Sequence, residues 1–260
     1  MGGTEAIRGG KGGRGGLGNV LSGIAVAIGF ALFLGGFVWG AVVYRPYTVP
    51  TDSMMPTVRP GDRVLAERID GGDVRRGDVI IFTDSLWSDS PMVKRVVGIG
   101  GDVVKCCGAA GEVTVNGVPL DEPYADTSKP ETGLEMPPGQ TAPTGTPFEV
   151  AVPEGNLFLL GDRRASSLDS RAHLQEAGQG TVSRSAVSAR VDALAWPEMK
   201  MLERPAAYEA LPGGISRTGP LRLQVMMVLA GAVLVAAGGA YGPVARVLAR
   251  GRRREPAGVR

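Results

Sequence analysis

The amino-acid sequence predicts a mainly β domain, barrel-like or sandwich-like, held between two transmembrane helices. Two long apolar runs lie near the ends of the 260-residue chain, and short β-prone stretches separated by glycine-rich turns fill the region between them. Forty glycines and nineteen prolines likewise favour turns over long soluble helices. The net charge of +2 is too balanced to indicate a nucleic-acid-binding protein.

The first apolar run predicts a transmembrane helix over residues 17–44, behind a disordered, glycine-rich tail of residues 1–16. As a helix, its uncharged core from Val20 to Val43 would extend roughly 36 Å, more than the ~30 Å hydrocarbon thickness of a bilayer. A cleavable signal peptide has an apolar core of about 7–15 residues, so we interpret the run as a permanent anchor. Aromatic residues typical of a membrane interface follow at its far end: Trp39, Tyr44 and Tyr47.

The second apolar run predicts a transmembrane helix over residues 221–247, followed by a basic tail of residues 248–260. Its core, Leu223–Ala245, is too long and too uniformly apolar to be typical of a buried helix in a soluble domain. Arginines gather at its end: Arg246, Arg250, Arg252, Arg253 and Arg254. The positive-inside rule then places both termini in the cytoplasm and residues 45–220 outside the plasma membrane.

Short stretches of β-prone residues fill the outer region: Arg63–Ile69, Val79–Phe82, Met92–Ile99, Asp102–Lys105, Glu112–Val118, Glu149–Val152, Leu157–Leu160 and Ala186–Trp196. Gly-Asp pairs lie beside several of them: Gly61-Asp62, Gly77-Asp78, Gly101-Asp102 and Gly161-Asp162. Asn116-Gly117 is the strongest hairpin signal. Residues 121–147 are rich in proline, threonine and glycine, which predicts a long surface loop or insertion.

A stiff, non-helical segment carries the first candidate for chemistry. Val49–Gly61 reads V-P-T-D-S-M-M-P-T-V-R-P-G, and its prolines, Pro50, Pro56 and Pro60, each fix φ and remove an amide donor. The hydroxyl of Ser53 is therefore held on a rigid segment just beyond a predicted membrane span. This position makes Ser53 a candidate nucleophile, although most serines are simple surface hydroxyls.

A serine nucleophile needs a base, and the sequence offers two candidates. The single histidine, His173, lies in a polar stretch typical of a solvated side chain. Lys94 interrupts an apolar strand, where burial would lower its pKa by the ~3 units, about 4 kcal/mol, that a base near neutrality requires. Arg95 stays protonated and faces the other side of the strand. Lys94 could equally protect an exposed strand edge from aggregation, and periodicity alone does not separate the two roles.

A third segment, Gly161–Arg171, concentrates charges and hydroxyls directly after an apolar strand. Its charged residues can pair among themselves or with Arg95: Asp162, Arg164, Asp169 and Arg171. Ser167 could steer a nearby lysine amine. A solvated charged loop is the alternative interpretation.

Taken together, these segments resemble the type I signal peptidases, membrane-bound serine endopeptidases that remove signal peptides from exported proteins. The similarity runs from Val49 to about Val191 and comprises P-T-D-S-M-M-P-T, G-D-R-V, R-G-D-V-I-I-F, V-K-R-V-V-G-I-G-G-D and G-D-R-R-A-S-S-L-D-S-R, in the family's order. Two spans with both ends in the cytoplasm resemble the forms found in some Gram-positive, actinobacterial-type organisms. Arg163 stands where the family commonly has asparagine.

The resemblance implies a mainly β fold of the type shared with self-cleaving repressors, and a Ser-Lys dyad in which Ser53 is the nucleophile and Lys94 the neutral general base. It further implies that the Ser53 N–H and the Thr51 hydroxyl form the oxyanion hole and that Ser167 orients the lysine. The structural ion pairs would involve Arg95, Asp162, Arg164, Asp169 and Arg171, and the pocket walls Val49, Met54 and Val93. The family uses no metal or organic cofactor, and its substrates are secretory preproteins with small residues at −1 and −3.

Two other functions are compatible with parts of the sequence. A self-cleaving repressor of the DNA-damage response also uses a Ser-Lys pair, but such proteins lack membrane spans. A membrane-anchored binding module with vestigial catalytic residues is the second alternative. The sequence leaves open whether Cys106 and Cys107 form a vicinal disulfide, pack as apolar groups or have a redox role. It also leaves open whether Leu86 and Trp87 contact lipid or belong to the core.

Overall fold

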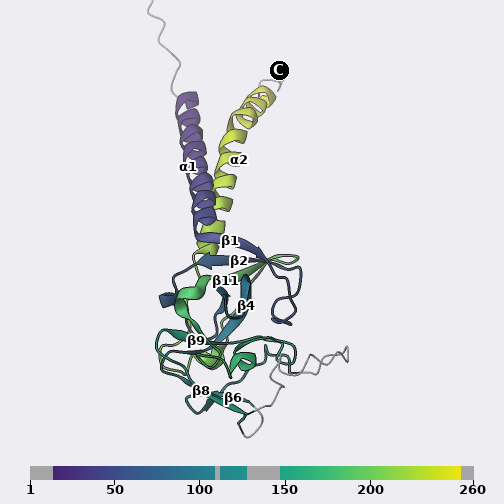
Figure 1. Ribbon diagram of the computed structural model, residues 1–260. Helices are drawn as coiled ribbons and strands as arrows, with labels where there is room; N and C mark the ends of the chain where they lie inside the picture. Colours follow the sequence, from purple (N-terminus) through teal and green to yellow (C-terminus); the bar gives the residue numbers. More distant parts are fainter. Residues whose placement is uncertain (1–13, 109–111, 128–146, 253–260) are drawn as a thin grey trace, which may run out of the picture. The chain divides into compact units, whose positions relative to one another are not determined.

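The computed structural model describes residues 14–108, 112–127 and 147–252, which form two compact units (Figure 1). One unit contains the two long helices and is formed by Met1–Val42 and Pro220–Arg260. The other unit, Val43–Gly219, contains every strand in the described residues. The predicted order of helix, β domain and helix is therefore confirmed.

Two helices, α1 (Arg14–Val43) and α2 (Leu221–Arg252), lie side by side in the first unit (Figure 1). The stretches Gly18–Val43 and Leu221–Val244 are long and apolar enough to cross a membrane, with mean hydropathies of 2.2 and 2.0. Small residues bring the helices together, because a Cβ on Gly29 would lie 2.8 Å from the carbonyl oxygen of Gly231. Ser22 Oγ also donates a 2.7 Å hydrogen bond to the carbonyl of Gly238 on the other helix.

Two antiparallel sheets form the second unit, as the mainly β prediction requires. The larger sheet has the order β1-β2-β11-β3-β4-β9-β10, with β12 paired to β11, and the smaller has the order β7-β6-β5-β8. The strands of the larger sheet are β1 (Tyr44–Thr48), β2 (Arg63–Arg68), β3 (Val79–Asp84), β4 (Ser88–Ile99), β9 (Asn156–Leu160), β10 (Thr181–Ser183), β11 (Val187–Trp196) and β12 (Lys200–Met201). The strands of the smaller sheet are β5 (Val103–Cys106), β6 (Val113–Val115), β7 (Val118–Pro119) and β8 (Phe148–Ala151).

Each predicted β-prone stretch contains a strand, whereas β1, β10 and β12 were not predicted. β10 and β12 span only three and two residues, and β1 carries Pro46, which lowers its β signal. β1 lies at the edge of the larger sheet, where a proline is tolerated. Tyr44, expected at a membrane interface, is instead a buried residue of β1 whose hydroxyl donates a 2.8 Å hydrogen bond to Asp192.

Three of the four Gly-Asp pairs form the same turn. In each, the glycine has a φ between 81° and 88°, and the aspartate N–H donates to the carbonyl three residues earlier. The aspartate side chain accepts a hydrogen bond from the backbone N–H of that same earlier residue. The pairs are Gly61-Asp62, Gly77-Asp78 and Gly101-Asp102. The positive φ explains the glycine, and the bond from the side chain to the backbone explains the aspartate.

The predicted hairpin at Asn116-Gly117 is confirmed. Both residues have positive φ, 52° and 80°, and they join β6 to β7, in which Val115 pairs with Val118. These angles match the two-residue turn that an Asn-Gly pair favours.

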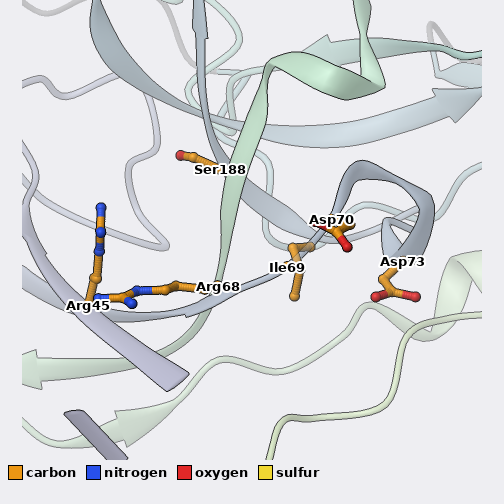
Figure 2. Close-up of a pocket in the computed structure, with 6 residues that line it drawn as sticks. All are labelled: Arg45, Arg68, Ile69, Asp70, Asp73 and Ser188. Carbon is orange, nitrogen blue, oxygen red and sulfur yellow. The ribbon is translucent and has the colours of Figure 1, made fainter. Parts of the chain in front are cut away.

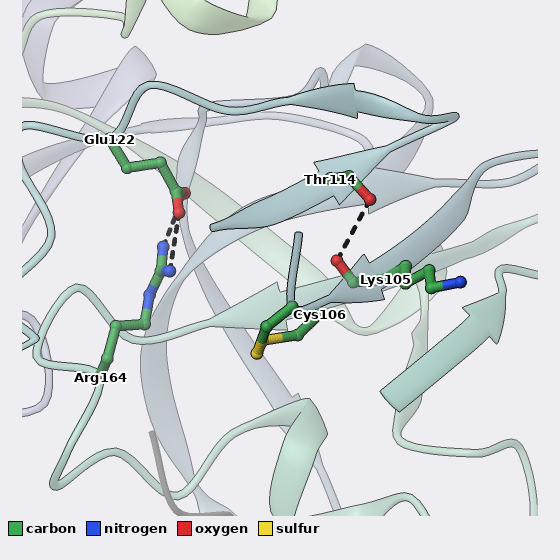
Figure 3. Close-up of a disulfide and its surroundings, with 6 residues drawn as sticks. Lys105, Cys106, Thr114, Glu122 and Arg164 are labelled. Atoms are coloured by element: carbon green, nitrogen blue, oxygen red, sulfur yellow. Dashed lines mark hydrogen bonds and ion pairs between the residues drawn. A yellow bond between two sulfur atoms is a disulfide. The ribbon is translucent and has the colours of Figure 1, made fainter. Parts of the chain in front are cut away.

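Cys106 and Cys107 form a disulfide at the end of β5 (Figure 3). Both also pack against the apolar cluster of the smaller sheet, which includes Val113, Phe148 and Val150. The vicinal disulfide and the apolar packing, which the sequence analysis gave as alternatives, thus occur together.

Candidate active site

The segment that carries Ser53 is the loop between β1 and β2, and backbone bonds close it at its base. The Val49 N–H donates to the carbonyl of Asp62 over 2.9 Å, and the Gly61 N–H donates to the carbonyl of Val49 over 2.8 Å. Met54 is fully buried within the loop and holds it against the domain. The loop backbone next to Ser53 is therefore fixed both by its ends and by an apolar anchor.

Lys94 lies beside Ser53. It sits in the middle of β4, and its Nζ is 2.9 Å from Ser53 Oγ. The two residues are only 5% and 6% exposed. The structure thus unites an amine and a hydroxyl, 41 residues apart in the chain, in a pair nearly closed to solvent.

Burial lowers the pKa of Lys94 below that of an ordinary lysine, because an ammonium ion loses hydration in this position. The carboxylates of Asp169 and Asp162 act in the opposite direction but only partly offset the effect of burial. The neutral amine is therefore favoured at a lower pH than in a solvated lysine. In that form, the nitrogen can accept the proton of the Ser53 hydroxyl.

Thr51 lies next to Ser53 on the same loop. Its Oγ1 is 3.2 Å from Ser53 Oγ, and its side chain is exposed. None of the described residues accepts a hydrogen bond from the backbone N–H of Ser53. Two hydrogen-bond donors therefore lie near the Ser53 hydroxyl. One is the N–H of Ser53 itself, and the other is the hydroxyl of Thr51, two residues earlier in the chain.

Two ion pairs form among the charged residues that the sequence analysis singled out. Arg95 binds Asp162 through two bonds of 2.7 and 2.6 Å, and Arg171 binds Asp169 at 2.9 and 2.8 Å. Burial acts to raise the pKa of Asp169, but Arg171 and the Gly161 N–H outweigh it, so the pKa lies below its usual range. The Asp169 carboxylate therefore stays charged and can fix its segment.

Arg164 pairs with a residue that the sequence did not single out. Its guanidinium binds Glu122 through bonds of 2.7 and 2.6 Å (Figure 3). Glu122 belongs to the predicted 121–147 surface loop, yet it is largely buried in this ion pair. Residues 121–127 form no helix or strand, although this ion pair holds Glu122 against the domain, and the prediction for residues 128–146 lies outside the described residues.

A pair of tyrosines next to Arg95 of β4 was also missed. The guanidinium carbon of Arg95 lies 4.1 Å from the ring centre of Tyr124, and the Tyr124 hydroxyl lies 2.8 Å from that of Tyr208. Tyr208 is completely buried. Neither tyrosine stands in a sequence pattern that predicts burial, because their partners come from distant parts of the chain.

Ser167 is brought to the site but does not form the predicted bond. It is 1% exposed, and its Oγ has no hydrogen-bond partner in the described part of the chain. A Cβ on Gly161 would collide with Ser167 and with the carbonyl of Ser53, so glycine lets these two groups lie close together. A lysine-orienting role for Ser167 stays a prediction.

The three predicted pocket residues belong to one apolar cluster. Val49 and Met54 are buried in it, and Val93 packs against it with part of its surface exposed. A separate hollow of about 430 Å³ lies between β1, β2 and β11 (Figure 2). The hollow is lined by Arg45, Arg68, Ile69, Asp70, Asp73 and Ser188. None of these is a predicted site residue.

His173 has partners other than the dyad. Its ring stacks on Trp87 with centroids 4.4 Å apart, and its Nδ1 lies 2.8 Å from Glu176. Trp87 is half-buried by this contact, whereas Leu86 is 71% exposed. The Ser-His alternative therefore has no support in the geometry of the described residues.

We expect His173→Ala to leave kcat/KM for preprotein cleavage nearly unchanged, because the ring contacts neither Ser53 nor Lys94. Initial rates at several substrate concentrations would measure this. An inactive His173→Ala enzyme with an unchanged melting temperature would restore histidine as the base.

The chain is similar to several known proteins. The family described as "Signal peptidase, peptidase S26" matches residues 19–196. Signal peptidase I of Mycobacterium tuberculosis is 31% identical over 198 residues, which cover 60% of this chain and 66% of that protein. Signal peptidase I U of Bacillus subtilis is 36% identical over 135 residues, covering 50% and 66%, and Signal peptidase IB of Staphylococcus aureus is 30% identical over 180 residues, covering 67% and 87%.

The chain thus spans just under two thirds of the length of the mycobacterial and Bacillus relatives and most of the staphylococcal one. A crystal structure of a signal peptidase I from Enterococcus faecalis aligns with 45% of this chain and 95% of its own, at 26% identity. Its TM-score is 0.32, too low to support an argument about the fold.

Proposed function

Because the chain belongs to the signal peptidase, peptidase S26 family, we propose that it is a membrane-anchored serine endopeptidase that removes signal peptides from exported preproteins. The observation that carries this proposal is the 2.9 Å contact between Lys94 Nζ and Ser53 Oγ, both nearly closed to solvent. The two helices of membrane-spanning length would hold the β domain at the outer face of the plasma membrane, with both termini in the cytoplasm.

The proposed reaction begins when neutral Lys94 takes the proton of the Ser53 hydroxyl. Ser53 Oγ then bonds to the carbonyl carbon of the −1 residue, and the carbonyl oxygen becomes an oxyanion. The oxyanion accepts hydrogen bonds from the Ser53 N–H and the Thr51 hydroxyl. As the C–N bond breaks, Lys94 returns its proton to the leaving amine of the mature protein. Lys94 next takes a proton from the water molecule that attacks the acyl-enzyme. It gives this proton to Ser53 Oγ as the acyl bond breaks and the signal peptide is released.

Small residues at −1 and −3 fit a substrate surface formed next to a packed apolar cluster. Val49 and Met54 are buried near Ser53, and Val93, which is partly exposed, precedes Lys94 on β4; this close packing leaves little room for a large side chain. We therefore propose cleavage after sites of the Ala-x-Ala kind.

The test uses the purified full-length protein in detergent micelles with one labelled preprotein. Mass spectrometry of the products identifies the bond that is broken. Cleavage after the −1 alanine, and its loss when that alanine is replaced by phenylalanine, would support the proposal. Absence of cleavage by the wild-type protein would contradict it.

A more specific prediction concerns Thr51. Thr51→Ala should lower kcat by about 10²–10³-fold, or about 2.7–4 kcal/mol, the usual cost of losing one oxyanion donor. Thr51→Ser, which keeps the hydroxyl, is the matched control and should stay close to wild type. Equal rates for the alanine and serine variants would show that Thr51 donates nothing to the oxyanion.

A further inference from the structure

Arg163 contacts the loop between β1 and β2 that carries Ser53, here called the nucleophile loop, at two points. Its backbone N–H donates a 3.0 Å hydrogen bond to the carbonyl of Ser53, and its guanidinium forms an ion pair with the side chain of Asp52. Asp52 and Ser53 flank a single peptide group. Arg163 therefore holds the residues on both sides of the peptide that carries the Ser53 N–H.

The residue before Arg163, Asp162, is fixed by several hydrogen bonds and an ion pair, which in turn fix the backbone of Arg163. The side chain of Asp162 forms an ion pair with Arg95 and accepts a 2.5 Å hydrogen bond from Thr57 Oγ1. The backbone carbonyl of Asp162 accepts a 2.7 Å hydrogen bond from the Asp126 N–H. Because Thr57 lies on the nucleophile loop, the Asp162-Arg163 pair contacts this loop both before and after Ser53. The pair thus acts as a fixed support for the loop.

The peptide between Asp52 and Ser53 is also bonded on its carbonyl side. The Asp52 carbonyl accepts a 2.9 Å hydrogen bond from the Met55 N–H. The flanking groups and the carbonyl are thus fixed, while the N–H of Ser53 has no acceptor among the described residues. A peptide plane held in this way presents its N–H in one direction.

We propose that Arg163 is a positioning residue that, through its ion pair with Asp52, aims the Ser53 N–H at the oxyanion of the reaction. This inference rests on the proposed function. The side chains of Arg163 and Asp52 are 22% and 43% exposed, and ion pairs this exposed contribute little to stability. A small change in the direction of a catalytic donor, by contrast, is costly in rate. The pair should therefore affect the reaction far more than the fold.

The test compares Arg163→Ala, Asp52→Ala and the double variant, all as full-length protein with a labelled preprotein. Each should lower kcat about 10- to 100-fold with little change in KM, because the oxyanion exists only in the transition state. The double variant should be no slower than either single variant, since both remove the same contact. Arg163→Lys keeps the charge and should recover part of the rate.

A peptide aldehyde ending in Ala-x-Ala gives a second readout. Ser53 Oγ bonds to the aldehyde carbon, the serine proton passes to Lys94, and the aldehyde oxygen becomes an oxyanion in the same place. The inhibition constant of the aldehyde should rise in Arg163→Ala by about the factor by which kcat falls. A general structural defect would instead weaken binding of substrate and aldehyde together.

Arg68→Ala, in the separate hollow, is the matched control and should behave as wild type. If the wild-type protein does not cleave the preprotein, the proposed function fails. If the wild type cleaves and Arg163→Ala keeps both its kcat and its affinity for the aldehyde, the positioning role fails alone. If Arg163→Ala raised KM by the same factor by which it weakened aldehyde binding, the positioning role would also be excluded.

Discussion

Ser53→Ala should abolish cleavage of an Ala-x-Ala preprotein, with a fall in kcat on the order of 10⁴-fold or more. The variant lacks the hydroxyl oxygen that, in the proposed reaction, bonds to the substrate carbonyl. Expression, membrane insertion and melting temperature should be unchanged, because removing one small hydroxyl leaves no large cavity.

The measurement is the initial rate of product formation by protein purified from cells without a competing peptidase activity. Ser188→Ala is a suitable control, because Ser188 is an exposed serine of β11 whose hydroxyl bonds only the carbonyl of Ile81. Near-wild-type turnover by Ser53→Ala would exclude Ser53 as the nucleophile.

Lys94→Met should lower kcat by about 10⁴-fold, the upper end of what a general base contributes. Methionine keeps a side chain of similar length and tolerates an apolar site, so the loss would report the amine and not the packing. Lys94→Arg should be equally inactive, because a guanidinium stays protonated and cannot accept the serine proton.

Lys105→Met is the matched control for Lys94. Lys105 is exposed and pairs with Glu149 on the surface of the smaller sheet, so its loss should not affect the rate. If Lys94→Arg kept most of the activity, a positive charge and not a base would be what the site requires. Lys94 would then act through its positive charge, and the proposed role of Lys94 as the general base would be wrong.

The sequence predicted the parts of the site whose signal is local. Ser53 stands in a proline-stiffened segment, and Lys94 interrupts an apolar strand; both patterns can be recognised within about ten residues. The structure brings these two side chains together. The Asn116-Gly117 hairpin was predictable for the same reason, since a two-residue turn depends only on its own backbone angles.

The features that were missed depend on contacts between distant segments. Glu122 and Tyr124 lie at the start of a stretch whose composition indicates a surface loop, and their contacts with Arg164 and Arg95 leave them only partly exposed. Arg163 was identified as a departure from the family pattern, but its pairing with Asp52 spans 111 residues and has no sequence signature. Ser167 shows the opposite case, in which a predicted role lacks the expected hydrogen bond.

The central claim is that Lys94 is an amine kept neutral by burial beside Ser53, and direct titration of Lys94 tests it. The chain contains only five lysines, so the ¹³Cε signal of Lys94 in labelled full-length protein can be assigned from its disappearance in Lys94→Met. We expect a pKa clearly below the ordinary lysine value of 10.5, matching the midpoint at which kcat/KM rises with pH. A Lys94 signal that titrates at or above the ordinary lysine value, with activity already full below it, would exclude Lys94 as a neutral base.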